Sequence, residues 1–411
     1  MAAKKKGKNT KPWARSMPES QFELMKQILA APSPVGLEAA MTHGVIADHL
    51  KTFLPKSWKV HGFKGSAGIL IDSAPDNEEA FSVMVIGHAD KIRMQVRSIS
   101  EDGKIWLDTD SFLPSTLIGH ETILFSEDPK NPGEWRSHTG GTVEALGAIH
   151  FASNEVRSGS SGITKEMIYL EMQLHGEKRK ERLEKMGIRP GDPVILNRPS
   201  RRGFDKDSFY GAYLDNGLGC FHTIEVAKLL AKSGLKNVRF LGAIASWEEI
   251  GRFGSRVLVG EFKPDVVIGV DVNHDYVAAP GIAARRLPSL TMGKGFTLSA
   301  GAIASAPLNT MIQKTALKHD IPMQMDVVGR DTGTDAMAGV LANVDAAATS
   351  IGFPIRNMHT ISETGHTGDV IAAIHVVSEL IKDMDGMNRG KGIKSKDLID
   401  QHPRLDKATK L

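Results

Sequence analysis

The spacing of apolar residues predicts regular elements at both ends of the chain. Apolar residues recur at helical spacing over 16–31, behind a Ser/Pro start, which indicates an amphipathic helix. The segment 39–54 predicts a second helix. The apolar, β-branched run 81–90 predicts a strand that ends in polar residues.

The middle and the C-terminal part follow different patterns. Over 92–200, short strand-like runs are separated by Gly, Pro, Asn and Asp, which indicates a small all-β module that also holds a charged helix closed by Gly187. From 211 to 384, helix-like and strand-like segments alternate. Such alternation predicts a sheet covered by helices on both faces. We therefore predict an α/β fold: a catalytic domain built on a helix-covered mixed sheet, with an inserted small all-β domain.

These patterns give provisional boundaries. We expect a catalytic domain formed by 18–91 and 201–386, an inserted β domain at 92–200, and tails at 1–17 and 387–411. Both tails carry many basic residues, and we expect them to be solvated and flexible.

Composition excludes several classes of protein. The 411 residues suffice for one large or two medium domains, and 41% apolar with 24% charged residues is ordinary for a globular protein. The net charge of +3 arises largely in the tails, and no interior basic run is interleaved with aromatic residues, so nucleic-acid binding is not expected. No secretory signal or membrane-spanning apolar run occurs, so no membrane partner is expected either. The single cysteine, Cys220, fits a small buried residue in a cytoplasmic protein.

Acidic and imidazole side chains gather where predicted elements begin or end. In open α/β sheets, ligands bind where strands end in loops. The candidate residues are His88, Asp90, Asp215, Glu248, Glu249, Asp271 and His359.

Each candidate has a structural alternative. Asp215 could cap the helix that follows it, and His359 could be a hydrogen-bonded core histidine. Asp271 could pair with an arginine or lysine. Glu248 and Glu249 could be surface acids at a helix start, where the helix dipole favours them. One metal site would explain all of these positions together.

The residue types favour two divalent ions. Two imidazoles and three carboxylates, one of them shared, suit two zinc-like or cobalt-like ions with a bridging water. A further carboxylate that is not a ligand must then take the proton of that water. Asp90, two residues after His88, is a plausible partner for the ring of that histidine.

The order of these residues resembles that of a known family. Together with "PSPVGLE", "MGIRPGDPV", "GKG" at 293–295, "GTDA" at 333–336 and "FPIRNMHTISE", they resemble the TET aminopeptidases of metallopeptidase family forty-two, which include glutamyl and deblocking aminopeptidases. The resemblance runs from near 32 to near 384 and leaves only the tails outside.

The resemblance implies roles for the candidate residues. It implies two metal sites that share one carboxylate: His88, Asp215 and Asp271 in one, and Asp215, Glu249 and His359 in the other. It implies Glu248 as the general base and Asp90 as the residue that orients His88.

It also implies an activity and an assembly. The activity is removal of N-terminal residues from peptides by a dinuclear aminopeptidase, with zinc or cobalt as the expected metal and manganese as a further candidate. The assembly is a homo-oligomer, a dodecamer by resemblance, in which the β module takes part in subunit contacts.

The chain departs from the family pattern at "HADKIR". Lys91 and Arg93 stand where family members commonly have an acid and a glycine, so the local field becomes more positive unless both side chains point to solvent. We expect the additional polar residues His274, Asp275 and His366 to be neither ligands nor pocket residues.

Two other functions use the same residues. A deacylase or amidase acting on small N-acyl amino acids would employ the same water chemistry. A non-catalytic binding or assembly protein with a vestigial site is a third hypothesis, and retention of all five ligands and the base argues against it.

Overall fold

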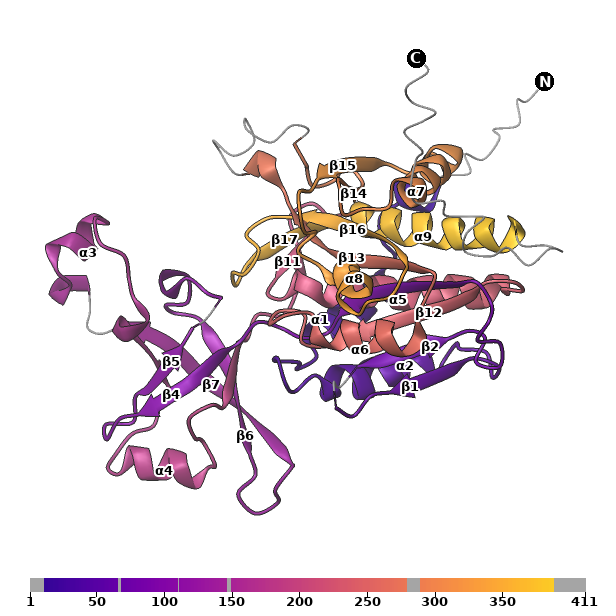
Figure 1. Ribbon diagram of the computed structural model, residues 1–411. Helices are drawn as coiled ribbons and strands as arrows, with labels where there is room; N and C mark the ends of the chain where they lie inside the picture. Colours follow the sequence, from indigo (N-terminus) through magenta and orange to yellow (C-terminus); the bar gives the residue numbers. More distant parts are fainter. Residues whose placement is uncertain (1–10, 66–67, 110, 146–148, 279–288, 388–411) are drawn as a thin grey trace, which may run out of the picture.

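A computed structural model describes residues 11–65, 68–109, 111–145, 149–278 and 289–387. Figure 1 shows a layered α/β body from which a smaller β-barrel projects. The predicted fold class is confirmed. The predicted tails lie largely outside the described residues, so their flexibility stays a prediction.

The body is built on one eight-stranded mixed sheet. Its strands lie in the order β1 (Lys59–Gly62), β2 (Ile69–Asp72), β12 (Arg239–Ala245), β3 (Ser82–His88), β13 (Val266–His274), β16 (Ala347–Ile355), β14 (Phe296–Ala300) and β15 (Met323–Val327). The four central strands, β12, β3, β13 and β16, are parallel to one another, and antiparallel pairings lie toward both edges. Their carboxyl ends therefore meet at one edge of the sheet.

Helices cover both faces of this sheet, because parallel strands of Val, Ile, Leu and Ala must be buried on both sides. One face packs against α1 (Glu19–Ala30), α5 (Leu214–Ser233), α7 (Ala306–His319) and α9 (Thr367–Met387). The other face packs against α6 (Phe253–Phe262) and α8 (Ala338–Leu341). A small sheet of β10 (Arg201–Arg202), β11 (Ser208–Gly211) and β17 (Glu363–His366) lies beside the body.

The inserted module is a closed antiparallel barrel with a hydrophobic core of its own. Its strands follow the order β4 (Met94–Ile99), β5 (Ile105–Asp108), β8 (Ile168–Glu171), β7 (Trp135–Ala145), β6 (Glu121–Glu127) and β9 (Pro193–Leu196). Helices α3 (Asn154–Ser158) and α4 (Arg179–Lys185) connect its strands. β4 pairs with β9 to close the ring.

One side chain of the body reaches into the barrel. Tyr213 packs in the barrel core, and its hydroxyl accepts a hydrogen bond of 2.8 Å from the Leu196 backbone N–H of β9. Asp215 follows two residues later, so the barrel and the start of α5 are directly connected.

The second predicted helix is not a regular α-helix. Over Ala40–Ile46 it is a π-helix, which continues into the short α2 (Ala47–Leu50). Gly44 lowers the intrinsic helix stability here, and the Thr42 hydroxyl donates to the Glu38 carbonyl at 3.2 Å, a contact that distorts helices. No helix among the described residues is both long and apolar enough to cross a membrane.

Candidate active site

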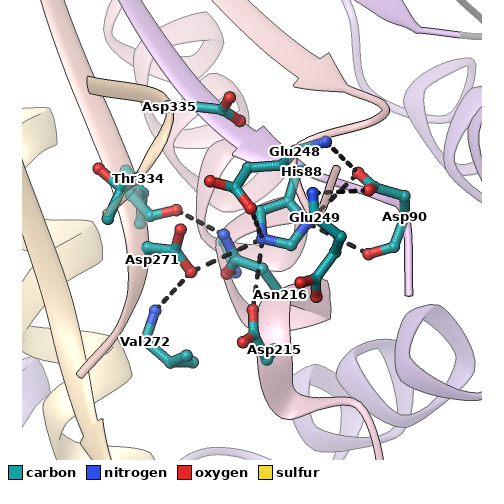
Figure 2. Close-up of polar contacts among 12 residues, drawn as sticks. His88, Asp90, Asp215, Asn216, Glu248, Glu249, Asp271, Val272, Thr334 and Asp335 are labelled. Carbon is teal, nitrogen blue, oxygen red and sulfur yellow. Dashed lines mark hydrogen bonds and ion pairs between the residues drawn. The ribbon is translucent and has the colours of Figure 1, made fainter. Parts of the chain in front are cut away.

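The predicted site residues meet at the carboxyl edge of the four parallel strands. His88 ends β3, the two glutamates follow β12, Asp271 lies near the end of β13, and His359 follows β16. The pairing of Gly269 with Ile86 brings Asp271, two residues further on, close to His88. Figure 2 shows how most of these side chains converge.

His88 is buried and held in a defined orientation. Its Nδ1 lies 3.1 Å from the backbone carbonyl of Asp90, which fits an N–H donor on that side. Its Nε2 lies 3.3 Å from Asp215 Oδ1 and 3.7 Å from Asp271 Oδ1. The Nε2 lone pair therefore points among carboxylates, as a metal-binding imidazole requires.

Asp215 lies between the two histidines. Its Oδ1 faces His88, and its Oδ2 lies 3.2 Å from Nε2 of His359. The alternative of a capping residue is wrong, because Asn216 accepts the Gly219 N–H at 2.8 Å and so caps the helix itself. One carboxylate oxygen of Asp215 thus points toward each half of the site.

Two groups of side chains have the composition and spacing to hold an ion. His88, Asp215 and Asp271 form one group, and Asp215, Glu249 and His359 form the other. In each group the candidate ligand atoms lie within 4.8 Å of one another. Asp215 belongs to both, as a bridging ligand would.

The two adjacent glutamates lie in one turn that follows β12. Trp247 adopts a positive φ of 59°, and the backbone N–H groups of Glu248 and Glu249 both donate to the Asp90 carboxylate, each at 3.1 Å. Glu249 faces His359 at 3.9 Å. Glu248 instead lies between His88 Nε2 and Arg252 Nε, 3.9 Å from each, and belongs to neither group.

Burial and crowding of negative charge shift the acidity of the site. Burial raises the pKa of Glu248 to about 9, with repulsion from Asp335 and Asp271 added and attraction to His88 opposing it. Burial, with repulsion from Asp215, raises the pKa of Glu249 well above its usual range. Burial also opposes ionisation of Asp215, but hydrogen bonds from both site histidines outweigh it and lower the pKa of that carboxyl.

The remaining alternatives for these residues fail as well. Glu248 and Glu249 are not surface acids, because their side chains are 11% and 8% exposed. His359 is 34% exposed and opens to a cavity rather than to the core. Among the described residues, Asp271 has His88 and no lysine or arginine as its ion-pair partner.

Glu363 and Asp335 are buried acids near the site that were not predicted. The buried Glu363 accepts backbone N–H groups of Leu214 at 2.6 Å, Asp215 at 3.3 Å and His359 at 2.8 Å, so it holds the two segments that carry site residues. Its position four residues after His359, in "HTISE", was the available signal. Asp335, which accepts from the Ser255 hydroxyl, lies buried beside the same region.

A cavity of about 790 Å³ opens onto these side chains. Its lining is strongly acidic and includes Asp326 and Asp331 in addition to the site residues. His274 lines this cavity too, contrary to expectation. Asp275 instead pairs with Arg356 at 2.9 Å, and His366 Nδ1 accepts the Gly368 N–H at 3.1 Å.

Lys91 and Arg93, the two residues that depart from the family pattern, are not fully exposed to solvent. Lys91 is 2% exposed, and its Nζ donates to the carbonyls of Leu29 at 2.8 Å and Ala31 at 2.5 Å, at the end of α1. The alternative in which it points to solvent is therefore wrong. Arg93 is half-buried. Cys220 is buried, as expected.

The sequence is similar to those of known aminopeptidases. A family model described as M42 glutamyl aminopeptidase matches residues 68–376. The lysyl aminopeptidase of Pyrococcus furiosus is 27% identical over 368 residues, which cover 89% of this chain and 98% of that protein.

Solved structures show the same fold. The TET aminopeptidase of the marine sediment archaeon Thaumarchaeota archaeon SCGC AB-539-E09 is similar with a TM-score of 0.76 and 22% identity, covering 90% of this chain and 99% of that chain. The TET1 peptidase of Pyrococcus horikoshii, which can assemble into a tetrahedron or a large octahedral shell, has a TM-score of 0.71 and 19% identity, covering 88% and 98%. The residues matched by the family model include all seven predicted site residues.

Proposed function

Because the chain belongs to the M42 glutamyl aminopeptidase family and is a peptide-bond hydrolase, we propose that it is a dinuclear aminopeptidase that removes N-terminal residues from peptides. The observation that carries the proposal is the pair of ligand groups that share Asp215 at the edge of the acidic cavity. This cavity suits the ammonium group of a free N-terminus, because opposite charges attract strongly where water is partly excluded.

The side chains fit two divalent cations. Glu249 Oε1 is buried and has no hydrogen-bond partner among the described residues, a costly state that a bound cation would relieve. Burial is the main cause of the raised pKa values of Glu249 and Asp271, and repulsion from the nearby carboxylate of Asp215 adds to it. Zinc or cobalt suits the imidazole and carboxylate donors best, and manganese also fits. When bound, such ions supply Lewis acidity toward the scissile carbonyl and the attacking water.

Two residues outside the ligand groups, Glu248 and Asp90, would have separate roles in the reaction. Glu248 lies outside both ligand groups and would accept a proton from the attacking water, then donate it to the leaving amine. Asp90 would fix the ring of His88 through its carbonyl while its carboxylate holds the backbone of both glutamates. Cations close to Glu248 would lower its pKa from about 9 toward neutrality, where a base is most effective.

We propose that the enzyme is a homo-oligomer, specifically a dodecamer, and that the barrel takes part in its assembly. The fold shared with the assembling Pyrococcus horikoshii peptidase supports this proposal.

The proposal is tested with a panel of aminoacyl reporter substrates. The metal-free protein is reconstituted with zinc, cobalt or manganese, and each form is assayed with free and with N-acylated reporters. We expect hydrolysis of free aminoacyl reporters only after metal addition. Hydrolysis restricted to N-acylated substrates would instead establish the deacylase, and metal binding without any hydrolysis would establish a binding protein.

A further inference from the structure

A second, smaller cavity shares Glu249 with the large one. It encloses about 150 Å³, the space of about five water molecules at ~30 Å³ each, which is sufficient for one small polar group and a short stem. Its lining consists of Val35, Ile92, Arg93, Gln95, Ser111, Glu249 and Ile250. A substrate group in this cavity would therefore lie next to the candidate metal centre.

Arg93 gives this cavity a positive charge. Its Nη2 donates to Gln95 Oε1 at 3.3 Å, and Gln95 in turn hydrogen-bonds Asp108, so the guanidinium is held in position. Glu38 and Asp192 attract Arg93 through space. Across the described ranges, however, no carboxylate forms an ion pair with Arg93, and its hydrogen bond to Gln95 uses only part of a guanidinium with five donors.

The two cavities that meet at Glu249 differ in the residues that they add to this shared carboxylate. The large cavity carries Asp326 and Asp331 besides the site carboxylates, whereas the small one contains a guanidinium and the Ser111 hydroxyl. Guanidinium groups bind carboxylates with particular strength, because two parallel N–H donors match two carboxylate oxygens.

On the basis of the aminopeptidase function proposed above, we propose that the Arg93 cavity is a subsite for a substrate carboxylate close to the scissile bond. The favoured substrates are peptides whose cationic N-terminus is attracted to the acidic cavity while a carboxylate enters the small one. That carboxylate is the side chain of an acidic first or second residue, or the terminal carboxylate of a dipeptide.

Matched substrate pairs test the proposal and identify the source of the carboxylate. The pairs are tripeptides with Glu or Gln as the first residue, tripeptides with Glu or Gln as the second residue, and one dipeptide with a free or an amidated C-terminus. For each pair, the measured quantity is the ratio of kcat/KM for the charged over the uncharged member. In the metal-loaded wild type we expect a ratio of about tenfold or more for at least one pair, the scale of a charge-assisted hydrogen bond.

Variants assign this preference to the guanidinium. Arg93→Gln should reduce the ratio to near one, and Arg93→Lys should retain part of it. Arg97→Gln is the matched control, because Arg97 lies on β4, which begins one residue after Arg93, and pairs with Glu166 at 3.6 Å outside the cavity lining. Each ratio compares two substrates on one preparation, so losses of folded or metal-loaded protein cancel.

The inference is overturned if all three ratios are near one in the wild type, or if Arg93→Gln leaves the preferred ratio unchanged. Failure of the aminopeptidase function is recognised separately. In that case the metal-loaded wild type cleaves none of the peptides, including the uncharged members.

Discussion

Glu248 and Glu249 are neighbours in sequence with separate surroundings. Glu249 has a buried, unpartnered carboxylate oxygen and belongs to a ligand group, whereas Glu248 faces Arg252 and belongs to none. Their backbone N–H groups share one acceptor, Asp90, which fixes the turn in which both glutamates lie. These surroundings fit the proposed roles, in which Glu248 transfers the proton and Glu249 binds metal.

Paired substitutions distinguish these two roles. Glu248→Gln should lower kcat by about 10²–10⁴-fold, the scale of general acid–base catalysis, while metal content stays near that of the wild type. Glu249→Gln should weaken metal binding by at least about 10–100-fold, since it replaces a ligand oxygen. Metal analysis after gel filtration and steady-state kinetics check both. Full activity of Glu248→Gln would show that another group moves the proton.

Glu38 provides a pH-dependent contribution to stability outside the ligand groups. Burial raises its pKa from 4.5 to about 7, its Gly36 N–H bond opposes this, and Asp90 adds repulsion. The folded-state pKa lies above the unfolded one, so its stabilising contribution is complete below pH 4.5 and is lost as pH rises through about 7.

The wild type should therefore lose stability relative to Glu38→Gln between pH 5 and pH 8. The relative loss should be roughly 3 kcal/mol at most. Urea unfolding of both proteins at the two pH values measures the difference, in which contributions of other titrating groups cancel. An equal pH dependence in both proteins would show that Glu38 ionises normally in the fold.

At the residue scale, the sequence indicated which residues belong to the site but not the direction in which each side chain points. The ligand candidates were recognisable because each is polar and lies at the end of an apolar run, as His88 and Asp271 do. Glu363 acts through hydrogen bonds to segments that are distant in sequence, so its neighbours alone could not assign it a role. Lys91 points toward the end of α1, and only the packing of that helix determines this.

At the scale of elements, the approach of β3 to α5 determines the distance between His88 and Asp215. A side chain at Gly87 would place its Cβ 2.4 Å from the backbone of Gly219, so the helix can lie this close only because position 87 has no side chain.

Gly87→Ala should therefore push α5 away from β3. We expect a loss of about 3 kcal/mol or more of unfolding free energy, because the obstacle is backbone and cannot rotate aside, together with weaker metal binding. Gly260→Ala in α6 is the control, since the nearest atom lies 4.0 Å from its added Cβ, and it should be neutral or stabilising by about 0.5–1 kcal/mol. Urea unfolding measures the stability of both variants, and metal titration measures their metal affinity. Equal stability and equal metal affinity in Gly87→Ala and Gly260→Ala would contradict this account.

Elements with strong local patterns were predictable, and pairings between distant segments were not. The buried strands β3, β12 and β13 follow from continuous apolar runs, and α9 follows from its helical periodicity. The short strands of the module were also recognisable. Its closure was not, because β4 and β9 come from opposite ends of the insertion and nothing local specifies their pairing.

At the scale of the whole molecule, the proposed assembly predicts a particle much larger than one 44.5 kDa chain. Phe151 on the barrel is 85% exposed and borders an apolar cavity of about 700 Å³, a combination typical of interaction surfaces. Multi-angle light scattering should give about twelve times the chain mass for a dodecamer.

Phe151→Ser should reduce the particle mass if this surface of the barrel carries a subunit contact. Phe204→Ser is the matched control, because Phe204 is also fully exposed but belongs to the body. A monomeric wild type would contradict the assembly, whereas a loss of mass in the Phe204 variant alone would move the contact from the barrel to the body.

The hydrogen bond between Tyr213 and Leu196 has a consequence for modularity. The barrel is joined to the body at two points of the chain, so it could in principle be exchanged between related proteins as a unit. Here its excision would deprive a buried phenol of its partner two residues before Asp215. Recombination at these two points should therefore succeed only where the recipient keeps a tyrosine at position 213 and the new barrel places a backbone N–H opposite its hydroxyl, so that the barrel and the catalytic edge are inherited as one unit.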